Sequence, residues 1–97
     1  MLTDVQHKHL RRLGHPLKPT VMIGGSGLTD RVAKEIEQAL DHHELIKVRV
    51  RVGDRKARDG IISRIAEQTG AELVQRIGNV AMFYKKNEKE PKLVLTK

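Results

Sequence analysis

IKVRVRV, residues 46–52, is the stretch of this chain that decides the fold. Its β-branched side chains alternate strictly with cations, which predicts a β-strand with one apolar and one charged face. A strand covered on both faces would instead be apolar throughout. We therefore expect helices to pack on one face of the sheet and to leave the other face open. Three cations, Lys47, Arg49 and Arg51, are expected to point outward from that open face.

The sequence on either side predicts three helices and three further strands. Capping residues and apolar spacing indicate a helix from Thr3 to a stop at Gly14, a second from residues 28–29 to about 42–43, and a third between Asp54 and Gly70. Apolar runs predict strands at residues 21–23, 73–77 and 80–85, the last two joined by a two-residue turn. Because helices connect the first three strands, right-handed crossovers are allowed there. The predicted fold is α/β, an α+β two-layer sandwich with a small mixed four-stranded sheet.

Gly24-Gly25-Ser26-Gly27 lies between the first strand and the second helix. Three glycines in four positions let the backbone turn tightly and let a partner approach without interference from Cβ atoms. The helix start that follows offers unpaired N–H groups and a positive dipole end, which together suit a phosphate. The alternative is a strand-to-helix turn with no ligand. Nucleotide-binding loops fit worse, because Leu28-Thr29 follow the last glycine and Asp30 stands where a dinucleotide fingerprint needs glycine.

The charge balance favours a polyanionic partner. Nineteen Lys and Arg oppose twelve Asp and Glu, a net charge of +7, which attracts nucleic acid over long range. Only Phe83 and Tyr84 are aromatic, so contacts to phosphate and shape are expected to outweigh base stacking. The candidate RNA contacts outside the glycine segment are Lys8, Arg11, Arg12, Lys18, Arg31, Lys47, Arg49 and Arg51. The alternatives are a solvated basic helix face and, for the strand cations, a cross-strand carboxylate such as Glu72.

Several functional classes have little support in the residues. No cysteine is present, and the histidines lack the i, i+4 spacing of a helical zinc pair, so we expect no metal and no cofactor. Ser26 and Ser63 lack a recognisable base, which indicates a protein that is not an enzyme. No apolar run approaches the length of a membrane span. We expect a cytoplasmic monomer with no membrane contact.

Ninety-seven residues suffice for one domain, expected over residues 1–86. Residues 87–97 are expected to form a charged C-terminal tail. Because residues 93–95 are apolar, the alternative prediction is that this tail contains one additional edge strand.

Separate blocks of the chain resemble the CRM domain (chloroplast RNA splicing and ribosome maturation) in its stand-alone bacterial YhbY-type form. The resemblance runs from Leu10 to about Tyr84, and its blocks are LGHPLKP at residues 13–19, IGGSGLT at 23–29, residues 35–36 and 39–40, HELIKV at 43–48, and Gly70. The family implies an RNA-binding fold similar to the C-terminal domain of translation initiation factor three. It also implies association with precursors of the large ribosomal subunit.

The resemblance further implies that the family's GxxG loop, here Gly24, Gly25, Ser26 and Gly27, contacts RNA. Many CRM domains carry a lysine or arginine inside this loop, whereas this chain has Gly25-Ser26. That difference shifts the expected charge contacts to Lys18 and Arg31. The alternative function is a protein-interaction module on the translation machinery, in which the charge serves solubility alone.

Overall fold

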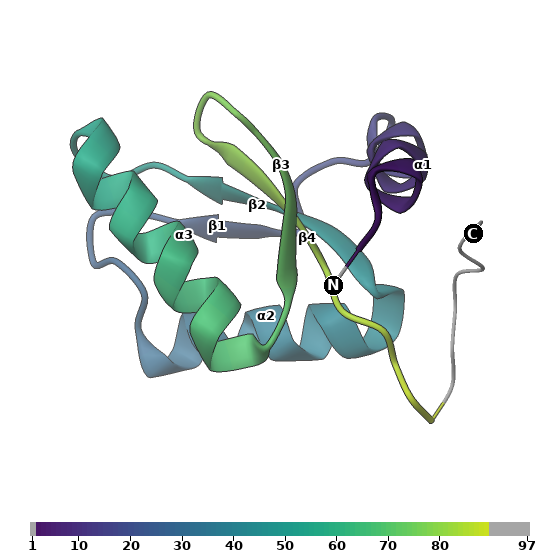
Figure 1. The fold of residues 1–97 in the computed structure, drawn as a ribbon. Coiled ribbons are helices and arrows are strands. Elements are labelled where there is room, and N and C mark those ends of the chain that lie inside the picture. Colours follow the sequence, from purple (N-terminus) through teal and green to yellow (C-terminus); the bar gives the residue numbers. More distant parts are fainter. Residues whose placement is uncertain (1, 90–97) are drawn as a thin grey trace.

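Helices and strands follow one another in the predicted order in a computed structural model, which describes residues 2–89 (Figure 1). The elements are α1 (Asp4–Gly14), β1 (Val21–Ile23), α2 (Asp30–His43), β2 (Leu45–Val50), α3 (Arg55–Thr69), β3 (Glu72–Ile77) and β4 (Val80–Tyr84). The α+β class is therefore confirmed. Residues 93–95, for which an added edge strand was the alternative prediction, lie outside the described residues, as does most of the expected C-terminal tail.

Side-chain caps set the start of each helix. Thr3 Oγ1 accepts the Gln6 N–H at 3.1 Å while Gln6 Oε1 accepts the Thr3 N–H at 2.9 Å, which confirms the predicted capping box. The Thr29 hydroxyl accepts the Val32 N–H at 3.2 Å, and Asp54 Oδ1 accepts the Ala57 N–H at 2.9 Å. Thr29 is the extended N-cap of α2, so the helix begins at Asp30, one residue after the expected opening at residues 28–29.

The strands lie in the order β1-β2-β4-β3, which confirms a mixed sheet of four strands. β1 pairs with β2 in parallel, and β4 runs antiparallel to both β2 and β3. The β3–β4 hairpin thus inserts its second strand next to β2, and β2 and β3 point the same way on either side of β4. β2 ends at Val50, two residues before the predicted end, so Arg51 lies beyond the paired strand.

Helices α2 and α3 cover one face of the sheet, as the alternation in β2 predicts. Ile36, Leu40, Ile62 and Ile65 from the two helices are buried against the strands. The strand residues in this core are Val21, Ile23, Ile46, Val48, Val50, Ala81 and Phe83. Every second residue of β2 therefore faces these helices, and Lys47 and Arg49 face the opposite side.

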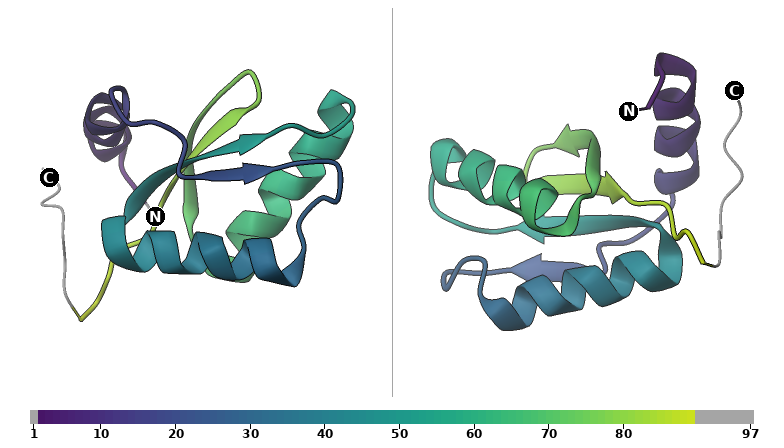
Figure 2. Two further views of the ribbon diagram at one scale, coloured as in Figure 1. Left: turned by 180° about the vertical axis from the view of Figure 1, so that it is seen from behind. Right: turned by 60° about the horizontal axis from the view of Figure 1, so that its bottom comes forward.

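That opposite face is not left fully open, which corrects the expectation from the sequence. Helix α1 stands apart from α2 and α3 (Figures 1 and 2) and packs across one end of this second face. Leu10 is completely buried there and forms a second core with Leu45, Val74, Met82 and Tyr84. The few apolar residues spaced along α1 predicted a helix. They did not predict the face of the sheet against which this helix packs.

Gly14 belongs to this contact rather than acting as a helix stop beyond the last turn. It is the last residue of α1 and is buried, and the helix is capped by His15. A Cβ at Gly14 would lie 2.5 Å from Cε of Met82 and 3.5 Å from Cδ2 of Leu45. Glycine here lets the end of α1 approach the sheet closely.

Glu44 connects the end of α2 to the chain beyond β4. It is fully buried, with φ of +60°, a backbone conformation that side-chain-bearing residues seldom adopt. Its carbonyl accepts the Lys85 N–H at 2.9 Å and its carboxylate accepts the Asn87 N–H at 2.6 Å. Burial and the carboxylates of Glu44 and Glu88 together raise the pKa of Tyr84 above its ordinary value.

Two leucines on the same helix test the packing of α1. Leu10→Ala removes a fully buried side chain and is expected to lower the free energy of unfolding by about 2–5 kcal/mol. Leu13→Ala is the matched control, because Leu13 is 37% exposed, and should cost about 1 kcal/mol or less. Urea unfolding followed by circular dichroism measures both. Equal losses of stability in the two variants would contradict the burial of Leu10 between α1 and the sheet.

Candidate nucleic-acid interface

The glycine segment forms a tight turn between β1 and α2. The Gly27 N–H donates to the carbonyl of Gly24 at 3.0 Å, and the Thr29 N–H donates to the carbonyl of Gly27 at 3.1 Å. Gly24, Gly25 and Ser26 are exposed. The predicted strand-to-helix turn is therefore present, and its tip faces solvent.

The chain itself requires glycine at only one of the three positions. Gly27 has φ of +74°, in the left-handed region that costs a side-chain-bearing residue free energy. Gly24 and Gly25 have no positive φ, and a Cβ added to either would meet nothing within 4 Å. Neither backbone conformation nor packing explains these two glycines. Their absent side chains leave the peptide groups of the turn open to close approach by another molecule.

The glycine turn lies at the edge where two parallel strands end. Because β1 and β2 run in parallel, their carboxyl ends meet at one edge of the sheet, the usual position of ligands in sheets of this kind. The Arg51 N–H donates to the carbonyl of Ile23 at 2.8 Å, so Arg51 lies beside the residue that precedes Gly24. Arg31 is exposed in the first turn of α2. Arg31 and Arg51 are thus the predicted cations that the fold places nearest the turn.

Lys47 and Arg49 lie on the sheet face that α1 covers only at one end. Their cross-strand partners on β4 are Met82 and Val80, so the alternative that a carboxylate faces them across the strand is wrong. Lys47 has an internal role, because its Nζ donates to the carbonyls of His15 and Leu17 at 3.1 and 3.0 Å. These bonds hold the connector after α1 against the sheet. Glu72 instead pairs in register with Tyr84.

The remaining predicted cations do not gather at the glycine turn. Lys8, Arg11 and Arg12 lie on α1, at the other end of the molecule from the glycine turn (Figures 1 and 2). Lys18 is exposed in the connector before β1, whereas the turn follows that strand. The fold therefore separates the predicted contacts into one group at the turn, one on the sheet face and one around α1.

Comparison with known proteins agrees with this architecture. A sequence profile of the CRS1/YhbY (CRM) domain matches residues 2–85. The chain belongs to the CRM domain family. A relative from Haemophilus influenzae described as an RNA-binding protein is 47% identical over 87 residues, which cover 90% of this chain and 88% of that protein. The probable RNA-binding protein YqeI of Bacillus subtilis is 33% identical and covers 98% of this chain and 99% of its own length.

A solved structure shows the same fold. The solution structure of a Staphylococcus aureus protein superimposes with a TM-score of 0.77 at 35% identity, and the match covers 97% of this chain and all of that chain. The resemblance stated from the sequence blocks is therefore confirmed at the level of family and fold.

The CRM domain carries further cations at the same edge that the sequence analysis did not select. Arg55, Lys56 and Arg58 occupy the start of α3, which lies at the same end of the sheet as the glycine turn (Figures 1 and 2). No acidic residue stands in this first turn, although cations are unfavourable at a helix N-terminus. A hollow of about 340 Å³ is lined by Arg55, Arg58, Arg76 and Gly78. The available sequence signal was the concentration of cations at residues 55–58, in the first turn of the helix that follows a parallel strand.

Part of this charge is used within the chain. Arg58 Nη1 donates to the carbonyl of Gly53 at 3.1 Å, and Arg76 forms an ion pair with Asp59. Within residues 2–89, no three His, Cys, Asp or Glu side chains lie close enough together to hold a metal ion. None of the helices in that range is long and apolar enough to cross a bilayer.

Alanine substitutions separate the structural glycine from the other two. Gly27→Ala is expected to lower the free energy of unfolding by about 1–2 kcal/mol, because alanine is strained at this φ. Gly24→Ala and Gly25→Ala should leave the free energy of unfolding unchanged or raise it by about 0.4–1 kcal/mol, because alanine lowers the conformational entropy of the unfolded chain. Thermal and urea unfolding measure all three. A large loss of stability at Gly24 or Gly25 would mean that the fold requires glycine there.

Proposed function

We propose that this CRM domain binds structured RNA through its phosphate backbone and acts without catalysis. The observation that carries the proposal is the pair Gly24 and Gly25, which the chain's own conformation and packing leave unexplained. A phosphate brought against the turn would meet peptide N–H groups, the positive end of α2 and the guanidinium groups of Arg31 and Arg51. The net charge of +7 supports a polyanionic partner.

In this mechanism, the residues that let the RNA backbone approach closely are not the residues that attract it electrostatically. The glycine turn has no cation of its own, so it supplies peptide groups that an RNA strand can reach without steric hindrance. Lys8, Arg11, Arg12, Lys18, Lys47 and Arg49 extend the positive surface toward α1. Contacts of this type position the protein on an RNA shape and carry little information on base identity.

The RNA we propose is ribosomal RNA in precursors of the large subunit, and the protein would act there in assembly. Support comes from the family resemblance and from relatives described as RNA-binding proteins. Sedimentation of the tagged protein with large-subunit precursors on sucrose gradients tests this. Co-purification that survives complete removal of RNA would instead indicate binding to ribosomal proteins.

Placing negative charge on the turn tests the RNA contact. Gly25→Asp with Ser26→Asp should lower affinity for structured RNA at least tenfold, because two carboxylates repel the phosphate. Both positions are exposed, so the thermal midpoint should stay close to that of the unchanged protein. Fluorescence anisotropy with a labelled RNA hairpin measures the affinity, and the same variant should no longer sediment with the precursors.

The control carries the same change of charge elsewhere. Ser63→Glu with Gln68→Glu places two carboxylates on exposed positions of α3. This variant should retain most of the affinity, since only long-range attraction is reduced. If both double variants weaken binding equally, the glycine turn does not bind the RNA. For each phosphate that the protein no longer neutralises, the slope of log affinity against log salt should also become shallower by about 0.7–0.9.

A further inference from the structure

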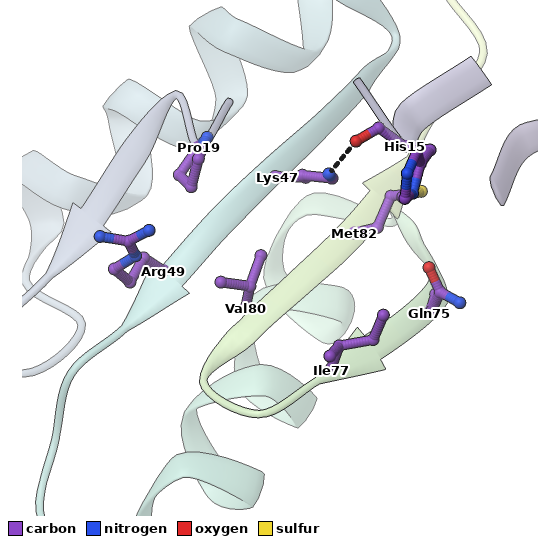
Figure 3. A pocket seen from close by; sticks show the side chains of 8 residues that line it. All are labelled: His15, Pro19, Lys47, Arg49, Gln75, Ile77, Val80 and Met82. Atoms are coloured by element: carbon purple, nitrogen blue, oxygen red, sulfur yellow. Dashed lines mark hydrogen bonds between the residues drawn. The ribbon is translucent and has the colours of Figure 1, made fainter. Parts of the chain in front are cut away.

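A cleft lies on the sheet face beside α1, in the area that the helix does not cover (Figure 3). It encloses about 310 Å³, at the small end of the range for ligand pockets, about 300–1,000 Å³. Its lining residues are His15, Pro19, Lys47, Arg49, Gln75, Ile77, Val80 and Met82. A single nucleotide matches this size.

Strand pairing determines the chemistry of the cleft. Arg49 of β2 lies opposite Val80 of β4, which lies opposite Ile77 of β3. In the next row, Lys47 pairs with Met82, and Met82 pairs with Gln75. Cations therefore stand on one side of an apolar floor and a carboxamide on the other, as Figure 3 shows.

Among the apolar side chains of this surface, Ile77 is well exposed and Met82 is buried. Ile77 is 67% exposed although it lies in a paired strand. Single exposed apolar residues are ordinary, but this one adjoins Val80 within a concave surface. Among residues 2–89, nothing covers this part of the face as α1 covers the other end.

We propose that the cleft binds one unpaired base of the RNA, an inference that rests on the proposed function. A nucleotide combines a flat apolar ring with a negative phosphate, which matches an apolar floor bordered by Lys47 and Arg49. Phe83 and Tyr84 are buried, so the ring packs on the aliphatic floor between the His15 imidazole and the Arg49 guanidinium, which both line the cleft. The Gln75 carboxamide can both donate and accept hydrogen bonds at the base edge.

Lys47 contributes a cation whose position is fixed. Two of its three N–H donors are bound by the carbonyls of His15 and Leu17. The third donor can bind a phosphate at the border of the cleft. Arg49 on β2 and Arg51 just beyond the end of that strand lead from the cleft toward the glycine turn, so the cleft and the turn lie on one path for an RNA strand.

Three RNA hairpins of equal length test the inference with the intact protein. One carries a single bulged nucleotide, the second an abasic bulge at the same position, and the third is fully paired. The bulged hairpin should bind about 5- to 10-fold more tightly than the other two, near the low end of the range for stacking of a base on an aromatic ring, because the floor here is aliphatic. A bulged 2-aminopurine should change its fluorescence on binding, which reports directly on the base.

Two substitutions on one strand locate the base. Ile77→Ser should reduce affinity for the bulged hairpin to that for the paired one and leave the paired affinity unchanged. Leu73→Ser is the control, because Leu73 lies on β3 opposite Phe83 and outside the cleft, and should alter neither affinity. The inference is overturned if the abasic bulge binds as tightly as the intact one, or if Ile77→Ser weakens all three hairpins equally. Failure of the unchanged protein to bind any hairpin would overturn the proposed function as well.

Discussion

The parallel pairing of β1 with β2 is the constraint on which the rest of the structure depends. Val21 and Ile23 lie opposite Val48 and Val50, and all four are buried under α2 and α3. A shift of one residue would turn Arg49 into that core, so the apolar alternation fixes the register. Because the two strands then end together, the glycine turn, Arg51 and the start of α3 meet at one edge.

The insertion of β4 between β2 and β3 has a second consequence for the uncovered face. It places Val80 and Met82 beside Arg49 and Lys47, so cations and apolar side chains share one surface. Helix α1 then divides this face, since Leu10 and Gly14 bring it onto Met82 and Leu45 at one end only. The glycine turn and the cleft are thus separate surfaces joined by the cations that follow β2.

Much of the local structure was predictable because its causes are local. Thr3 with Gln6 and Asp54 with Ala57 form the caps that their spacing indicates, and β2 alternates as its sequence does. The beginning of α2 was predicted slightly early, because Thr29 serves as its extended N-cap. The sequence named candidate cations for the site but not their arrangement in space. Lys18 and Arg31 were both expected beside the turn, and Lys18 instead precedes β1.

The sequence by itself determined the order of elements, the two faces of β2 and the glycine turn, since each depends on residues close together in the chain. It also determined the family, through several separate blocks of residues in a fixed order. Only the tertiary structure decided that α1 covers part of the cationic face and that β4 lies beside β2. It also decided which cations stand near the turn and that Ile77 borders a cleft. These features depend on contacts between segments that are distant in the sequence. The free energy of such contacts comes from surface that both segments bury together, and the residue pattern of one segment alone does not determine it.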